Sequence, residues 1–329
     1  MLLPHLRRLL RDRFLLGMLL AVGLAVLTPQ FGRSGGTLHL DALSNAGIFA
    51  VFFLHGIGLS MQSLRAGLLN WRLHTLVQAH TFLVFPLLWL ALDALFGAWV
   101  PQGLMLGFWY LCALPSTISS SVAMTALGRG NVPGAIFNAT LSSLLGIVLT
   151  PLLVSLMVAH GGEGGRGPGE AILNIAGLLL APFVLGQLLR PWLGAWFAER
   201  KRWTGLIDRG VILMLVYGSF CDATAGGLWS DYGAGVLATA FAGSALLLAI
   251  VLGLSRRAAR GLGFSVEDEV AAVFCGSKKT LASGMPMAKL LFGASPALGL
   301  VVLPILLYHP LQLFVCSVMA ERYAARPAR

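Results

Sequence analysis

Ten apolar stretches, each about as long as a membrane-crossing helix, follow one another along the chain. A bilayer has about 30 Å of hydrocarbon, which takes about 20 apolar residues to cross as a helix. Backbone groups in that layer must bond within their own segment, which favours helices over the alternating strands of a barrel. We therefore expect an all-α integral membrane protein with ten transmembrane helices, over residues 14–31, 41–60, 73–98, 103–127, 132–158, 171–197, 205–224, 232–254, 268–291 and 296–320.

Lysine and arginine are unevenly shared between the two ends of these stretches. Of the 23 basic residues, 18 fall on the side that holds both termini, three on the other side (Arg33, Arg166 and Lys289), and two within a stretch. Positive loops mark the cytoplasmic side, so the pattern predicts the inner membrane of the cell, cytoplasmic termini and an even number of spans. The same bias explains the net charge of +10 without a nucleic-acid partner. The apolar stretch after Arg13 lacks a convincing signal-peptide cleavage site, and we interpret it as the first membrane helix.

The chain has few features of an enzyme or a metalloprotein. Charged residues make up 11% of its 329 residues, against about 25% in soluble domains, so no separate soluble domain is expected. The four cysteines have neither metal-binding nor redox spacing and lie mostly within apolar stretches. No nucleophile–base arrangement, zinc motif or phosphate-binding loop is present. We therefore expect no catalytic residues, no metal site and no cofactor, apart from possible coupling to a sodium ion or a proton.

An internal repeat appears when the chain is shifted by 163 residues. Seven identities fall within 22 positions, where this composition gives roughly two by chance, although coincidence among small residues stays an alternative. The repeat pairs the fourth span with the ninth, so the two copies cross the membrane in opposite directions. It therefore predicts a five-plus-five inverted repeat with halves 1–165 and 166–329, an architecture typical of secondary transporters. The matched pairs are Cys112 and Cys275, Thr117 and Thr280, Ser120 and Ser283, Met124 and Met287, Leu127 and Leu290, Gly130 and Gly293, and Pro133 and Pro296.

Both repeated spans contain helix breakers near their centres. Pro115 lies in the fourth span, and Gly276, Gly284 and Pro286 lie in the ninth. A proline inside a span removes one helical hydrogen bond and clashes with the preceding turn. The freed backbone groups can bind ions or ligands where protein or water surrounds them. We therefore expect both helices to be discontinuous and to cross at a binding site.

Lys278 and Lys279 lie within the ninth span, about 15 Å along a helix axis from the acidic residues that open it. A charge at this depth costs several kcal/mol unless it faces a cavity or a partner, and such residues are usually functional. In one interpretation, one lysine pairs with Asp93, Glu267 or Glu269 and the other reaches the membrane surface. In the other, one lysine replaces a bound sodium ion and holds the fourth and ninth spans together, while its neighbour attracts an anionic substrate. The sequence does not say which lysine has which role.

Further polar residues complete the predicted substrate or ion site. Serine and threonine hydroxyls in a membrane helix often bond back to a carbonyl one turn earlier, and Asn, Gln and His often bond between helices. A histidine can also carry a proton near neutral pH. These structural roles stay open for each residue. The candidates are Pro115, Ser116, Thr117, Ser119, Ser120, Ser121, Asn138, Gly276, Ser277, Lys278, Lys279, Thr280, Gln78, Thr81, His309 and Gln312.

Several motifs resemble the bile acid:sodium symporter family, which is solute carrier family 10 in animals. The motifs are Thr125-Ala126-Leu127-Gly128-Arg129-Gly130-Asn131 and Leu149-Thr150-Pro151. Two more are similar to the branch with the seventh human member and its bacterial relatives: Phe274-Cys275-Gly276-Ser277-Lys278-Lys279-Thr280 and Leu307-Tyr308-His309-Pro310-Leu311-Gln312. The resemblance implies a panel domain of helices 1, 2, 6 and 7 and a core domain of helices 3–5 and 8–10. Substrate would bind between the two domains.

The ninth span departs from the pattern of this family. Sodium-coupled members have a Glu in its unwound part, whereas this chain has Lys278 and Lys279 nearby and no acid. Repulsion between a lysine ammonium and a sodium ion a few ångströms away would cost several kcal/mol. We therefore expect alternating-access transport of a small organic anion, with proton coupling or ion-independent exchange as alternatives to sodium. A channel-like or regulatory membrane protein, for example in ion homeostasis, is the other hypothesis. Whether the chain is a monomer or a homodimer is open.

Overall fold

The structure is a computed structural model that describes residues 12–58, 70–160, 168–293 and 297–327. Over these ranges the secondary structure is helical throughout, with no strand, as the sequence predicts. The first half contains α2 (Arg13–Leu27), α3 (Pro29–Gly32), α4 (Leu40–Gly58), α6 (Trp71–Ala79), the π-helical turn η1 (His80–Val84), α7 (Phe85–Phe96), the 3₁₀ turn η2 (Gly97–Trp99), α8 (Gln102–Ala113), α9 (Ser119–Leu127) and α10 (Val132–His160). The second half contains α11 (Pro168–Glu199), α12 (Lys201–Ala225), α13 (Leu228–Gly261), α14 (Val266–Gly276), α15 (Gly284–Phe292) and α16 (Leu298–Ala324).

Seven helical segments among the described residues are long and apolar enough to cross a membrane. They are Leu40–Gly58, Trp71–Trp99, Val132–Leu156, Gly177–Glu199, Arg202–Ala225, Leu228–Gly261 and Leu298–Ala324. The other three predicted spans contain shorter helices. The first holds α2, which is apolar but only 15 residues long, and the fourth and ninth are each split into two helices. The prediction of ten spans is therefore compatible with this fold and stays a prediction.

Local sequence explains where several helices begin. The Asp12 carboxylate accepts hydrogen bonds from the backbone of Phe14 and Leu15 at the start of α2. Asn70 caps α6 in the same way, and the Ser265 hydroxyl accepts from the backbone of Asp268 in α14. Three acidic residues also occupy the first turn of α14, where the helix dipole favours negative charge. These caps satisfy amide groups that have no partner within the helix.

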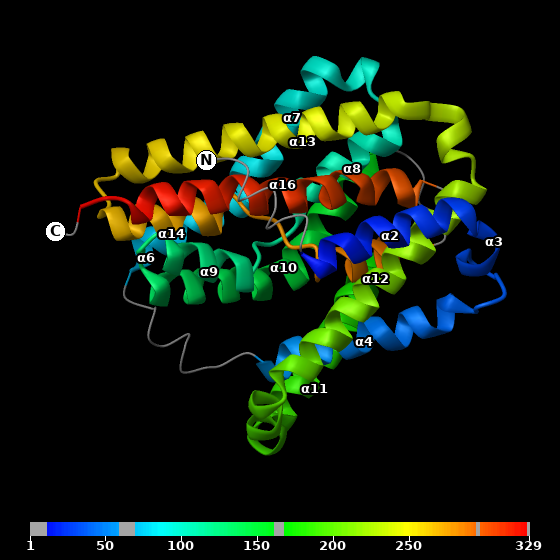
Figure 1. The fold of residues 1–329 in the computed structure, drawn as a ribbon, viewed down its shortest axis with the longest axis horizontal. Coiled ribbons are helices and arrows are strands. Elements are labelled where there is room, and N and C mark those ends of the chain that lie inside the picture. Colours follow the sequence, from blue (N-terminus) through cyan, green and yellow to red (C-terminus); the bar gives the residue numbers. More distant parts are fainter. Residues whose placement is uncertain (1–11, 59–69, 161–167, 294–296, 328–329) are drawn as a thin grey trace.

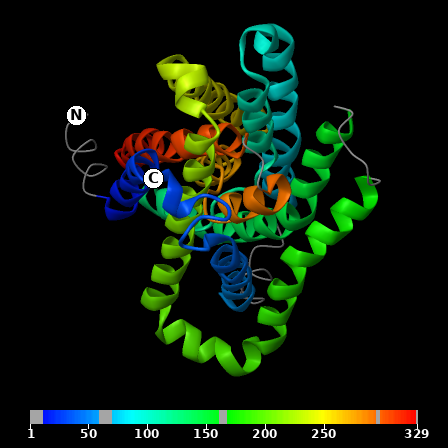
Figure 2. The same ribbon diagram turned by 90° about the vertical axis from the view of Figure 1, so that its right-hand side faces the viewer.

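Two groups of helices pack mainly among themselves (Figures 1 and 2), and they also contact each other where α10 meets α11 and where α12 meets α15 and α16. One group consists of α2, α3, α4, α11 and α12, and the other of α6–α10 and α13–α16. In the first group, α4 and α11 approach so closely that a side chain at Gly56 would clash with the Phe183 carbonyl. A side chain at Gly186 would clash with the Phe53 carbonyl. Small residues that let helix backbones touch are typical of membrane helix packing.

The outer surface carries many large apolar side chains. Exposed examples are distributed over several helices and include Leu19, Leu27, Leu83, Leu95, Trp99, Leu188 and Trp192. In water such a surface would drive association, whereas lipid tails solvate it. The fold is therefore that of an integral, multi-pass membrane protein. The predicted boundary at 165/166 and the extreme termini lie outside the described residues.

Candidate ion and substrate site at two broken helices

The first break separates α8 from α9. Helix α8 ends at Ala113, α9 begins at Ser119, and Leu114–Ile118 between them are not helical. Pro115 cannot donate a backbone hydrogen bond here, and its ring packs so closely on Gly146 of α10 that no side chain would fit there. The Ser142 hydroxyl of α10 accepts a hydrogen bond from the backbone N–H of Ser116 at 2.9 Å. The break that Pro115 predicts is therefore present and held by α10.

The second break separates α14 from α15, with Ser277–Ser283 between them. Helix α16 fixes this segment through two side chains. The Tyr308 hydroxyl donates to the Ser277 carbonyl at 2.7 Å. The Gln312 amide accepts from the Lys279 N–H and donates to the Lys279 carbonyl, each at 2.8 Å. A backbone that has left the helical pattern thus regains its hydrogen bonds from a neighbouring helix, as membrane burial requires.

The two breaks contact each other directly. The Thr280 N–H donates to the Pro115 carbonyl at 3.0 Å, which joins the two backbones. The Ser116 hydroxyl donates to the Cys275 carbonyl at 2.6 Å, and the Ser121 hydroxyl donates to the Phe274 carbonyl at 3.1 Å. Segments about 160 residues apart in sequence therefore meet at one place.

Lys279 occupies this meeting point and is fully buried. Its ammonium donates to the carbonyls of Cys112 and Leu114 at 2.8 and 2.6 Å, and to the Thr81 carbonyl in η1 at 2.8 Å. It also lies 4.0 Å from the centre of the Phe85 ring. Three acceptors match the three hydrogens of an ammonium group, whereas a neutral amine has only two. Lys279 therefore ties the end of α8 to η1 and to the second break as a buried cation.

Lys278 is equally buried but has fewer partners. Its ammonium donates to the Ser120 carbonyl in α9 at 2.8 Å and lies 5.7 Å from the centre of the Phe274 ring. Within the described part of the chain this carbonyl is its one hydrogen-bond acceptor. Lys278 thus keeps donor capacity that Lys279 has used.

Two of the acids that the sequence suggested as partners for these lysines are paired with arginines instead. Glu269 binds Arg256 at 3.3 Å and Arg260 at 2.9 Å. Glu267 binds Arg326 at 2.8 Å. Among the described residues no ion pair joins Lys278 or Lys279 to a carboxylate. The alternative in which one lysine pairs with a structural acid is therefore not what this structure contains.

The remaining candidate residues fall into three arrangements. The Thr117 hydroxyl bonds with those of Ser120 and Ser121, at 2.7 and 2.9 Å, beside the first break. Gln78 of α6 donates to the Asn138 carbonyl at 3.1 Å, and His309 bonds with Gln312 at 3.1 Å.

Individual positions within these arrangements differ in their surroundings. The Thr81 hydroxyl bonds back to the Val77 carbonyl at 2.9 Å, the structural role left open for it, while its own carbonyl binds Lys279. Gly276 ends α14, close to His80 and Ser255. Ser119 is exposed, unlike its buried neighbour Thr117.

Several residues at the breaks were not among the predicted candidates. Tyr308 lies four residues before Gln312 on α16, so both reach the same segment, a spacing that the sequence shows. The Tyr110 hydroxyl donates to the Gly284 carbonyl at 2.5 Å, and the Thr150 hydroxyl to the Ala113 carbonyl at 2.8 Å. No local pattern marks these two, because their acceptors are backbone carbonyls on another helix. The described residues contain no group of three or more His, Cys, Asp or Glu side chains placed to hold a metal ion.

Comparison with known proteins identifies the family. The model of the SBF-like CPA transporter family matches residues 12–325. The chain is 47% identical to the uncharacterized protein PA2026 of Pseudomonas aeruginosa, over 97% of this chain and 95% of that protein. It is 43% identical to the putative symporter YfeH of Escherichia coli, over 95% and 92% of the two chains. It is 31% identical to sodium/bile acid cotransporter 7 of Rattus norvegicus, over 95% and 93%.

YfeH and sodium/bile acid cotransporter 7 carry the names of a symporter and a cotransporter, and the matching family model is that of a transporter family. The resemblance to the bile acid:sodium symporter family that the motifs indicated is thereby confirmed. The chain belongs to the SBF-like CPA transporter family within that superfamily, and it is a membrane transporter rather than an enzyme.

Proposed function

We propose that this chain is a secondary active transporter that moves a small organic anion by alternating access. The observation that carries the proposal is the pair of buried lysines at the junction of two broken helices. A binding site at such a junction, reachable from either side in turn, is how many secondary transporters work. Lys278 is the proposed anchor for the anion, because its ammonium retains hydrogen-bond donors for an oxyanion.

Lys279 is proposed to take the place of a sodium ion. Its ammonium lies among three carbonyl oxygens at 2.6–2.8 Å, an arrangement that could equally coordinate a monovalent cation. A second cation in the same oxygen cage would meet the repulsion of the ammonium. We therefore propose transport without sodium at this position, by ion-independent exchange or with a proton. His309, which is linked through Gln312 to the backbone of Lys279, is the candidate proton carrier.

The proposed architecture is ten helices in an inverted repeat of residues 1–165 and 166–329. The ends of the two broken helices support it. Helix α8 ends at Ala113 and α14 at Gly276, which is the 163-residue shift of the sequence repeat. Helices α9 and α15, which follow the two breaks, are both nine residues long. The proposed panel comprises α2–α4, α11 and α12, and the proposed core comprises α6–α10 and α13–α16, in line with the two packed groups.

The proposed location is the inner membrane with both termini in the cytoplasm. Its support is that basic residues assigned to one side by sequence gather in space. Arg326 of the C-terminal segment donates to the Gly128 carbonyl, and Arg129 donates to the Arg326 carbonyl. The C-terminus and α14 lie at one end of the molecule and α3 at the other (Figure 1). A reporter enzyme fused to the C-terminus, active only on one side of the membrane, tests this orientation.

Transport itself is tested by counterflow in proteoliposomes. Vesicles loaded with succinate, taurocholate or sulfate are diluted into a trace of the same labelled anion, with sodium or with choline as the cation. Alternating access predicts transient accumulation of label with at least one anion, and its loss in the Lys278→Met variant. The Thr239→Ala variant, altered at an exposed position of α13 outside the candidate site, is the control and should keep the activity.

A channel-like or regulatory role is the second candidate, favoured by the absence of the family's sodium-binding acid in the ninth span. A channel equilibrates label without transient accumulation, and a regulator gives no flux. Either result for all the anions tested would replace the transporter proposal.

A further inference from the structure

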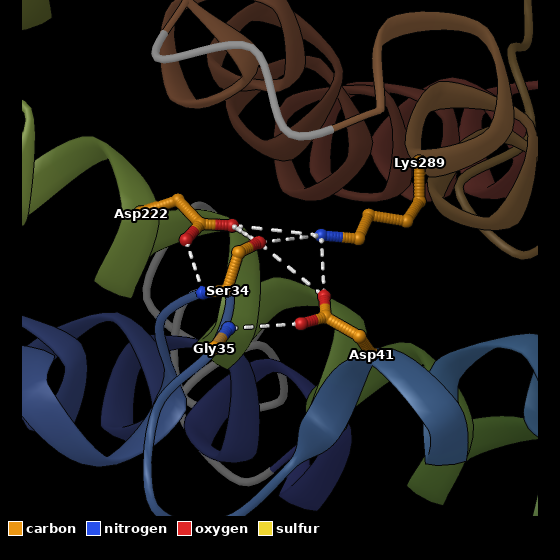
Figure 3. Close-up of polar contacts among 5 residues, drawn as sticks. All are labelled: Ser34, Gly35, Asp41, Asp222 and Lys289. Atoms are coloured by element: carbon orange, nitrogen blue, oxygen red, sulfur yellow. Dashed lines mark hydrogen bonds and ion pairs between the residues drawn. The ribbon is translucent and has the colours of Figure 1, made fainter.

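A third lysine connects the two packed groups at the end of the molecule that holds α3. Lys289 is in the last turn of α15, and its ammonium lies 3.5 Å from carboxylate oxygens of both Asp41 in α4 and Asp222 in α12. It lies equally far from the Ser34 hydroxyl in the segment between α3 and α4. Figure 3 shows the lysine reaching from α15 toward the two carboxylates. One side chain of the proposed core thus contacts three residues of the proposed panel.

The acidic side of this contact is built within the panel. Asp222 accepts from the Ser34 N–H at 2.6 Å and from the Ser34 hydroxyl at 3.0 Å. Asp41 accepts from the Gly35 N–H at 3.0 Å and from the Ser34 hydroxyl at 3.3 Å. Gly35 has a φ of +70°, which glycine adopts without strain. The panel therefore holds both carboxylates in place through its own hydrogen bonds, whether or not Lys289 is present.

The basic side of the contact is held less tightly. The lysine reaches across on a flexible four-carbon stem, and its three contacts, each at 3.5 Å, are at the long limit of a hydrogen bond. Its side chain is 14% exposed and that of Asp222 11%, while Asp41 is half exposed. Two carboxylates held by the panel and a lysine on a flexible side chain suit a contact that forms and breaks repeatedly.

We infer that Lys289, Asp41 and Asp222 form an ionic latch that holds the proposed core against the proposed panel at the α3 end. The inference rests on the proposed function, because a latch of this kind matters only if panel and core separate during transport. Opening would withdraw Lys289 from the two carboxylates and admit solute toward Lys278 from that side. The latch would therefore set the balance between the closed and open states of this entrance.

The test measures access beneath the latch without any substrate. Ser219 lies three residues before Asp222 on α12, hence on the same helix face, and it is 1% exposed. In the Ser219→Cys chain, purified at full length in detergent, the rate of maleimide labelling at position 219 reports opening. Native Cys221 is an internal control, because it is buried against Gly32 of α3 within the panel. Opening between panel and core exposes position 219 alone, whereas unfolding exposes both.

Adding Lys289→Met should raise the rate of labelling at position 219 about tenfold, because the open state rises from about 1% of the molecules to about 10%. The labelling of Cys221 should not change. Lys289→Arg, which keeps the charge, should stay near the parent rate. If Lys289→Met also exposes Cys221, the same labelling is measured in the Asp41→Asn variant. This variant weakens the latch but leaves the hydrogen bonds between Asp222 and Ser34 in place. Labelling at position 219 that stays at the parent rate in the folded variants overturns the latch. Because no substrate is used, the labelling result can be told apart from a failure of counterflow: labelling reports whether Lys289 holds panel and core together, and counterflow reports whether their separation serves transport.

Discussion

Helices α8 and α14 both end in the middle of the molecule, and they are capped in different ways. The last carbonyls of any helix lack helical partners and carry the negative end of its dipole. At α8 the carbonyls of Cys112 and Leu114 receive the Lys279 ammonium, and the Ala113 carbonyl receives the Thr150 hydroxyl. At α14 the carbonyls of Phe274 and Cys275 receive neutral hydroxyls from Ser121 and Ser116. Two ends that align in the sequence repeat therefore differ in the charge of their cap.

This difference indicates how the two broken helices could hold together. A charged donor makes stronger hydrogen bonds than a hydroxyl. Here the charged donor is the side chain of Lys279 and not a bound ion. The α8 end is thus joined to the second break by an ammonium group, while the α14 end depends on weaker contacts. The predictions below test this contrast, beginning with the charged cap.

Replacing Lys279 by Met should have the largest effect on stability. The variant leaves three buried carbonyls without their donor, and each buried acceptor left unsatisfied costs about 1–3 kcal/mol. We expect the midpoint of thermal unfolding in detergent to fall by on the order of 10 °C.

Lys278→Met is the matched control for this variant. It removes a buried charge with a single described acceptor and should change the midpoint far less, or raise it. An equal fall of the unfolding midpoint in the two variants would show that the two lysines contribute equally to stability, which contradicts the prediction.

Replacing Gln312 by Leu should come next. The backbone N–H and carbonyl of Lys279 would both lose their partner, and each buried unsatisfied group costs about 1–3 kcal/mol. Thermal unfolding measures this loss too. His309→Leu, which leaves both bonds to Lys279 in place, should cost less. A larger loss from His309→Leu than from Gln312→Leu would contradict the role given to the glutamine.

Removing the neutral caps of α14 should have a smaller effect. Ser116→Ala and Ser121→Ala each delete one hydroxyl donor, and a hydrogen bond of this kind contributes about 1 kcal/mol. Ser119→Ala, at an exposed site on α9, should stay within about 0.5 kcal/mol of the parent. If either capping serine proves as costly as Lys279, the charged and neutral ends are equivalent.

Exchanging sodium for choline should have the smallest effect. With the Lys279 ammonium inside the oxygen cage, we expect no shift of the unfolding midpoint between sodium chloride and choline chloride. A bound sodium ion would stabilise the fold by about 2.7 kcal/mol at 100 times its dissociation constant. A clear rise of the midpoint in sodium would therefore mean that the ion binds despite the lysines.

Much of the fold follows from local sequence. Apolar runs predicted the long helices to within a few residues at most boundaries, for example 132–158 within α10 and 73–98 within Trp71–Trp99. Pro115 and the glycines at 276 and 284 predicted the two breaks, because a proline or a glycine weakens a helix and the repeat pairs these two spans. Helix breakers alone do not decide this, since α10, α11 and α16 continue through Pro151, Pro182 and Pro304.

The division of roles between Lys278 and Lys279 depends on tertiary structure. Adjacent residues in a non-helical segment point in directions that local pattern does not fix. The direction of Lys279 is set by carbonyls 165 to 198 positions away. The contact of Lys289 with Ser34 joins residues 255 positions apart. The sequence placed both lysines in the ninth span, where the structure has the break between α14 and α15. Which oxygen each charge binds was decided only when distant helices packed and brought their backbone acceptors within reach.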